Sequence, residues 1–148
     1  MRLALLMFGT LCLSQVVSAA YACTCPPLAS AAEQAEEFDM IFIGSPRESI
    51  NVSPPIEWKP GDPPPPPRAD RYETMFDIER VLKGENVSAV KISHSEPNPL
   101  SCGIMYTDDA PRLILASGSQ ETGYSTWFCS IPQFSVEAFD EALKPAAD

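Results

Sequence analysis

Histidine is nearly absent from the sequence: His94 is the only one among 148 residues. A hydrolytic site that uses histidine as its base also needs a nucleophile, and the chain has no G-x-S-x-G motif to supply one. We therefore expect a protein that is not an enzyme and has no resident cofactor. His94 lies between Ser93 and Ser95, and with no evident partner it is interpreted as a surface residue.

Basic side chains are also scarce, with 10 lysines and arginines against 20 aspartates and glutamates. A surface of this sign repels phosphate backbones and anionic lipid, so we expect no nucleic-acid partner and no adsorption to acidic membranes. The acidic pairs Glu36-Glu37 and Asp108-Asp109 are interpreted as solvated faces. Calcium binding would need more oxygen ligands at tighter spacing.

The sequence has no apolar run of the roughly 18 residues that a transmembrane helix requires. Residues 1–22 instead combine the cation Arg2, a short apolar stretch over residues 3–13 and a closing series of small residues, which is typical of a secretory signal peptide. We predict a removable leader over residues 1–22 and one domain over residues 23–148, secreted or periplasmic, without a stable membrane span.

The site of leader cleavage determines the first residue of the exported chain. Ala20-Tyr21-Ala22 fits the A-x-A rule and would leave Cys23 first. Cleavage after Ala19 would instead leave three residues ahead of Cys23. Two further alternatives are a retained amino-terminal anchor and acylation of Cys23; acylation is disfavoured by the bulk of Tyr21.

Cysteines are few: Cys12 falls in the leader and four remain, at positions 23, 25, 102 and 129. An even number in an oxidising compartment predicts two disulfides. A bridge between Cys23 and Cys25 would close a very tight ring, so each pairs with a distal cysteine, which leaves two pairings open. A zinc site normally offers C-x2-C pairs and a redox dithiol needs a free pair, so both are weaker alternatives.

Short helices are predicted near both ends of the exported chain. Ser30 and Glu33 form a capping box for a helix that runs to about Glu37. A closing helix has Ser135 as its N-cap and an apolar side formed by Val136, Phe139 and Leu143.

Extended segments fill most of the chain between the helices. Their apolar residues alternate or form short buried runs at residues 40–44, 72–82, 87–93, 103–106, 112–116 and 124–131. Residues 54–67 contain eight of the 16 prolines and cannot donate the hydrogen bonds that a sheet requires, so they form an exposed, polyproline-like loop. The pattern predicts a mainly β, small closed or partly open barrel.

Several short motifs occur in a characteristic order along the exported chain. They are Cys23-Thr24-Cys25-Pro26, the segment 38–44, Val81-Leu82-Lys83-Gly84, Ser101-Cys102-Gly103, and Cys129 followed by Ile131 and Pro132. In this order they resemble the netrin-like domain, and most closely the N-terminal domain of the tissue inhibitors of metalloproteinases.

The resemblance implies a five-stranded OB-fold (oligonucleotide/oligosaccharide-binding) barrel with flanking helices, and disulfides that join Cys23 to Cys102 and Cys25 to Cys129. The sequence departs from the vertebrate pattern because a third bridge and the cysteine-rich C-terminal domain are missing. Residues 54–67 also enlarge the loop between the first two strands, a loop that in the family can contact the protease.

The resemblance also implies a secreted inhibitor of zinc metalloproteases, and we expect the protein to be a monomer. The free α-amino group and the carbonyl of Cys23 would bind the zinc of the target protease in place of its water. Thr24 would enter the first primed-side pocket, and the rest of the inhibitory edge would fill the cleft on either side: Cys25, Pro26, Pro99, Leu100, Ser101 and Cys102. The alternative is a noncatalytic exported binding or structural module that uses the barrel as a scaffold.

Overall fold

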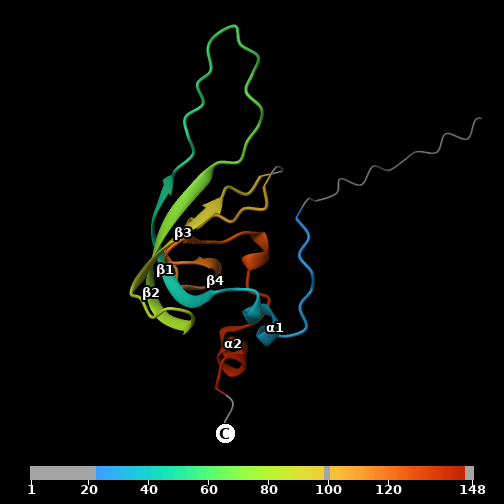
Figure 1. The fold of residues 1–148 in the computed structure, drawn as a ribbon, viewed down its shortest axis with the longest axis vertical. Helices are drawn as coiled ribbons and strands as arrows, with labels where there is room; N and C mark the ends of the chain where they lie inside the picture. The colour runs from blue at the N-terminus through green and yellow to red at the C-terminus, as the bar shows by residue number, and fades with distance from the viewer. Residues whose placement is uncertain (1–22, 99–100, 146–148) are drawn as a thin grey trace, which may run out of the picture.

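The computed structural model describes residues 23–98 and 101–145, which form a closed barrel with two short helices at one end (Figure 1). The strands are β1 (Met40–Asn51), β2 (Arg71–Lys83), β3 (Ala89–Ser95), β4 (Arg112–Ser119) and β5 (Gly123–Ser125). The helices are α1 (Ala31–Glu36), the 3-10 turn η1 (Phe128–Ser130) and α2 (Val136–Ala142). The predicted mainly β, five-stranded OB-type barrel with two short flanking helices is confirmed. The predicted leader, residues 1–22, lies outside the described residues.

The barrel closes because β1 pairs with two neighbours. Met40 to Gly44 pair with β4, while the ladder to β2 extends along β1 to Asn51, so that the strand order around the barrel is β1-β2-β3-β5-β4. Gly44 lies where β1 changes partners, and a Cβ there would come within 2.6 Å of the Asp77 carbonyl oxygen. A glycine at this point allows the close backbone approach that a sharply bent strand needs.

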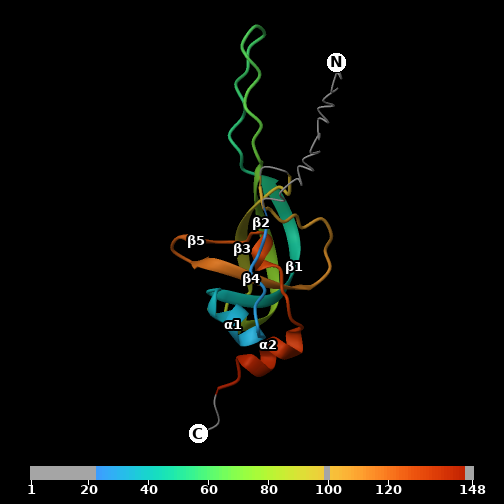
Figure 2. The same cartoon turned by 90° about the vertical axis from the view of Figure 1, so that its right-hand side faces the viewer.

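Two apolar clusters lie on opposite faces of the strands, because successive side chains of a strand point to opposite sides. The barrel interior contains Met40, Phe42, Phe76, Val90, Ile92, Tyr106, Ile114, Ala116 and Tyr124. The second cluster fills the space between the barrel wall and the helices with Ala31, Ala35, Phe38, Ile41, Leu115 and Phe139. The helices therefore pack against the outside of the barrel wall at one end of the molecule, the lower end in Figure 2.

Helix α1 begins at the predicted N-cap, where the Ser30 hydroxyl accepts a hydrogen bond from the Glu33 amide at 3.2 Å. The Glu33 carboxylate accepts in return from the Ala29 amide at 2.7 Å, one residue earlier than an ideal capping box. Helix α2 likewise starts after Ser135, as predicted. None of the helices in the described ranges is long and apolar enough to cross a membrane.

Two predicted strands are wrong. Residues 103–106 form no strand. Tyr106 instead turns into the barrel interior, where its hydroxyl shares a hydrogen bond with the Thr126 hydroxyl at 2.9 Å. Residues 124–131 form a strand only as far as Ser125 and then coil into η1. Trp127 and Ile131, which follow the period of two expected of a strand over residues 124–131, instead lie on the surface on either side of the disulfide-bonded Cys129.

The proline-rich loop is exposed, as predicted, and projects from the barrel as a long arm (Figures 1 and 2). We call residues 52–70 the arm. Its tip is a turn in which the Asp62 amide donates to the Lys59 carbonyl at 3.0 Å. Pro60 and Gly61 are the central residues, and Gly61 has φ of 103°, which is the geometry of a type II turn.

Candidate functional site at the amino-terminal disulfides

Two disulfides attach the first described residues to distant parts of the chain. Cys23 is bonded to Cys102 with their Cα atoms 5.5 Å apart, and Cys25 is bonded to Cys129 with their Cα atoms 5.4 Å apart. These are the two pairs that the family resemblance implies. Disulfides of this kind form and persist in oxidising compartments.

The structure brings together most of the predicted inhibitory edge. Thr24 and Pro26 are exposed, whereas Cys23 and Cys25 on either side of Thr24 are half-buried. Ser101 and Cys102 lie alongside because of the first disulfide. We call residues 23–26, 101 and 102 the amino-terminal edge. Pro99 and Leu100, the two other predicted members, lie outside the described residues.

The loop that carries Cys102 is held against the end of β3. The Ser101 hydroxyl donates to the Glu96 carbonyl, and the Ser101 amide donates to the Asn98 carbonyl at 3.1 Å. A Cβ on Gly103 would come within 1.9 Å of the Ser95 carbonyl oxygen, so only glycine fits where the chain crosses the strand. These contacts fix one side of the edge.

The other side of the edge rests on η1. The Phe128 amide donates to the Cys102 carbonyl at 2.7 Å. This hydrogen bond joins the loop of Cys102 to η1, the turn that contains Cys129. The buried Gln34 side chain of α1 donates to the Ile131 carbonyl at 3.1 Å and accepts from the Gln133 amide at 2.9 Å. Gln34 follows Ala31 by three residues, so both lie on the buried face of α1. This spacing in the sequence could have identified Gln34 as a buried residue.

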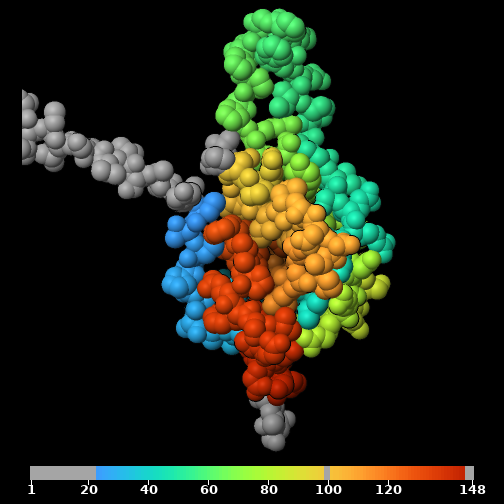
Figure 3. All heavy atoms as spheres, turned by 180° about the vertical axis from the view of Figure 1, so that it is seen from behind, coloured from blue at the N-terminus to red at the C-terminus, as the bar shows by residue number. Residues whose placement is uncertain are grey.

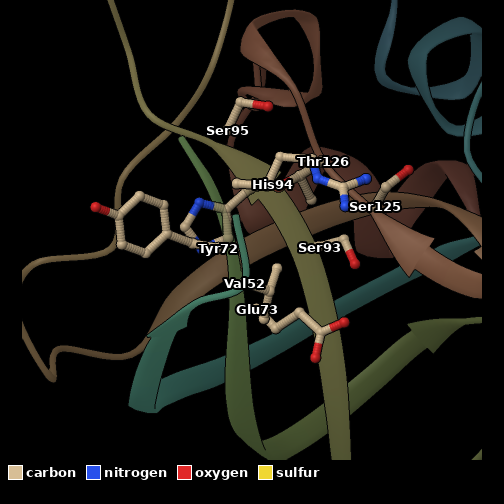
Figure 4. A pocket seen from close by; sticks show the side chains of 9 residues that line it. Val52, Tyr72, Glu73, Ser93, His94, Ser95, Ser125 and Thr126 are labelled. Atoms are coloured by element: carbon tan, nitrogen blue, oxygen red, sulfur yellow. The ribbon is translucent and has the colours of Figure 1, made fainter. Parts of the chain in front are cut away.

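A separate shallow pocket of about 230 Å³ lies on the surface between β2, β3 and β5 (Figure 4). Its lining is polar and includes Glu73, Ser93 and Ser125, while Tyr72 projects away from these hydroxyl groups. Glu73 is paired with Lys91 at 2.8 Å. The His94 ring also lines this pocket, but its Nε2 lies against the Thr74 hydroxyl rather than against one of the serines.

His94 is buried, with 4% of its surface exposed, and the interpretation as a surface residue is wrong. Its Nε2 lies 2.6 Å from the Thr74 hydroxyl, its ring packs edge-on against Tyr106, and its Nδ1 forms no hydrogen bond of normal geometry with the described residues. Burial lowers the pKa of His94 below its usual 6.5, and the nearby backbone of Ile104 partly opposes this effect without completing a hydrogen bond of normal geometry. The sequence contained the information that His94 is buried. Val90, Ile92 and His94 follow the period of two that places alternate side chains of a strand inside the barrel.

No group of three or more histidine, cysteine, aspartate or glutamate side chains is arranged to hold a metal ion within residues 23–98 and 101–145. No family model matches the chain, and no curated protein matches it either.

Proposed function

We propose that the protein is a secreted or periplasmic inhibitor of zinc metalloproteases whose amino-terminal edge enters the protease active site. The observation that carries the proposal is the double attachment of residues 23–26, which presents exposed Thr24 between two disulfide-bonded cysteines. The resemblance of these motifs to tissue inhibitors of metalloproteinases supports the same function.

The proposed mechanism requires that leader removal makes Cys23 the first residue. A catalytic zinc ion keeps three protein ligands and an open position that normally binds water. The α-amino nitrogen and the carbonyl oxygen of Cys23 would occupy that position, and Thr24 would enter the adjacent specificity pocket. Because the disulfide to Cys102 already fixes the backbone, little conformational entropy is lost on binding.

The contacts behind the edge support a rigid rather than an adaptable binding element. The hydrogen bond from Phe128 to Cys102 and the crossing at Gly103 hold both bridges against the barrel. A side chain of Thr24 that enters a pocket would therefore do so without rearrangement of the fold. Such preorganisation is the main way in which an exposed segment gains affinity.

The test uses protein exported with its own leader, purified and characterised by mass spectrometry to establish the amino terminus. Inhibition is then measured against a panel of zinc metalloproteases with a fluorogenic peptide, for the natural protein and for a form with one alanine added before Cys23. We expect the added alanine to raise the inhibition constant at least about 100-fold, which corresponds to about 2.8 kcal/mol. The melting temperature of the two forms should be equal.

A matched control is a Thr24→Ser form, which keeps the amine free and should retain most of the inhibition. Inhibition that survives the added alanine would refute the metal-binding mechanism. A mature chain that begins at Ala20, or with an acylated Cys23, would also refute it. The protein would then be better described as a noncatalytic exported module built on the same barrel.

A further inference from the structure

The large apolar side chains that are exposed in the described residues fall into two places only. Ile50 ends β1 and is followed by three in the arm, at Val52, Ile56 and Trp58. The others are Trp127, Phe128 and Ile131, which we call the aromatic patch. Scattered single apolar residues are common on protein surfaces, but clusters of this kind mark interaction sites.

Hydrogen bonds at the base and at the tip hold the arm in a defined shape. At its base the Val52 amide donates to the Arg71 carbonyl at 2.8 Å, and the Arg71 amide donates to the Ser53 hydroxyl at 2.7 Å. The Arg68 guanidinium joins the two limbs through the Pro54 carbonyl. At the tip the Trp58 indole donates to the Asp62 carbonyl at 3.3 Å. Prolines and these contacts lower the entropy cost of binding.

Trp127 of the aromatic patch lines an apolar pocket of about 340 Å³, whereas Ile131 lines a different pocket, beside Tyr106. The wall of the Trp127 pocket also includes Phe38, Pro26, Leu28 and the Cys25–Cys129 bridge. The amino-terminal segment and the segment after β5 lie side by side on this face of the molecule, below the arm (Figure 3). Grooves lined by aromatic rings are the surfaces that bind proline-rich extended segments.

We propose that the arm of one molecule docks against the aromatic patch and its pocket on a second copy of the same chain. The arm projects away from its own barrel, so its tip does not face its own patch (Figures 1 and 2). The chain thus carries both halves of a proline-to-aromatic contact, at separate places. This proposal replaces the expectation of a monomer and does not depend on zinc binding.

Charge favours the arm as the segment that approaches another copy. The arm, residues 52–70, contains three acidic and two basic side chains, whereas the rest of the chain has 17 acidic against 8 basic ones. The arm therefore meets less repulsion from an acidic neighbour than a second barrel would. Lys59 at the tip would also be attracted to Glu37, which lines the pocket.

The contact is head-to-tail, since each copy offers one arm and one patch. Such an interface closes into a ring where the rotation between copies allows it, and otherwise leaves an unused arm and an unused patch at the two ends of an open chain. The natural protein should therefore show a mean mass that rises with concentration.

The experiment is sedimentation velocity of the natural protein and of two single variants up to about 1 mM, a range that populates contacts with a dissociation constant near 100 µM. Trp58→Ser damages only the arm and Trp127→Ser only the patch, and the two tryptophans are similarly exposed, at 51% and 52%. We expect each variant to be monomeric alone. Their equimolar mixture should form a one-to-one dimer that grows no further, because it contains one intact arm facing one intact patch.

Glu121→Gln, on the exposed turn before β5, is the control and should associate like the natural protein. If a tryptophan variant melts below the natural protein, Ile56→Ser and Phe128→Ser repeat the same pair of changes. A natural protein that stays monomeric throughout, association that survives Trp58→Ser, or a variant mixture that stays monomeric would each overturn the proposal.

Discussion

Gly103 allows the loop with Cys102 to cross the end of β3, and its small size is required by the Ser95 carbonyl oxygen. We predict that Gly103→Ala destabilises the protein by about 1–3 kcal/mol through overpacking, and that it weakens protease inhibition as well. The measurement is urea unfolding together with the inhibition assay. Gly61→Ala is the comparison, because an added Cβ there meets nothing within 4 Å and only the positive φ is strained. Equal stability of Gly103→Ala and the natural protein would contradict the crossing as described.

His94 is the residue through which the barrel responds to acid. Its pKa in the folded protein is lowered by burial, so between that value and 6.5 the unfolded chain binds more protons than the folded one. The stabilising contribution of the neutral ring is therefore complete above about pH 6.5 and is lost as the pH falls through the folded-state pKa. We predict a free energy of unfolding that decreases from pH 7 to pH 5.

Since the chain has a single histidine, NMR reports the titration of His94 without ambiguity. The comparison stays above pH 5 because Arg112 lowers the pKa of Asp108, and the backbone amide of Glu137 lowers the pKa of its own carboxyl, so both groups add their own acid dependence further down. His94→Gln should flatten the dependence between pH 7 and pH 5. A histidine signal that titrates at 6.5 in the folded protein would show that burial does not act as argued.

Residue types alone indicated part of the candidate site. The C-x-C motif and the count of four exported cysteines predicted two long-range disulfides, but the choice between two pairings came from the family resemblance. The exposure of Trp127 could not be predicted, because a large apolar residue in an alternating segment normally faces a core. His94 could have been placed correctly had its period with Ile92 been weighed above its polar neighbours.

At the scale of secondary structure, α1 depends on a neighbouring strand. The helix has six residues and no basic residue in its last turn, and Lys83 of β2 supplies the missing charge. The Lys83 ammonium donates to the Ala35 carbonyl at 2.7 Å and to the Phe38 carbonyl at 2.6 Å. Cations at a helix C-terminus stabilise the helix and satisfy carbonyls that have no partner within it.

We predict that Lys83→Met lowers the free energy of unfolding by about 1.5–3 kcal/mol, the range for hydrogen bonds to a charged group. Methionine has an unbranched side chain of similar length and removes the ammonium group, both its donors and its charge. Chemical denaturation provides the measurement, and Lys91→Met, on the exposed face of β3, is the matched control with an expected change below about 1 kcal/mol. A similar loss in both variants would count against the role of Lys83.

Helices were predicted better than strands because capping residues mark a helix end locally. Ser30 and Ser135 both cap helices as expected. The end of β5 depends on tertiary contacts instead: the Thr126 amide donates to the Ser93 carbonyl at 3.0 Å, and the chain then turns into η1 toward the bridge at Cys129. No local pattern in the sequence encodes these long-range contacts.

At the scale of the whole molecule, the barrel and the arm are separable. Neither apolar cluster includes a residue of the arm. We predict that replacing residues 54–67 with a short glycine-serine linker changes the melting temperature by less than about 4 °C, equivalent to less than about 1 kcal/mol. Calorimetry measures this, and a much larger loss would show that the arm stabilises the barrel.

The central claim is that the amino terminus of Cys23 ligates the metal of a protease, and a cobalt-substituted metalloprotease tests it most directly. Cobalt(II) at the zinc position absorbs visible light in a way that depends on its ligands. Addition of the natural protein should inhibit the enzyme and change this spectrum, while the form with an extra alanine before Cys23 should do neither. Inhibition by the natural protein with an unchanged cobalt spectrum would contradict the claim.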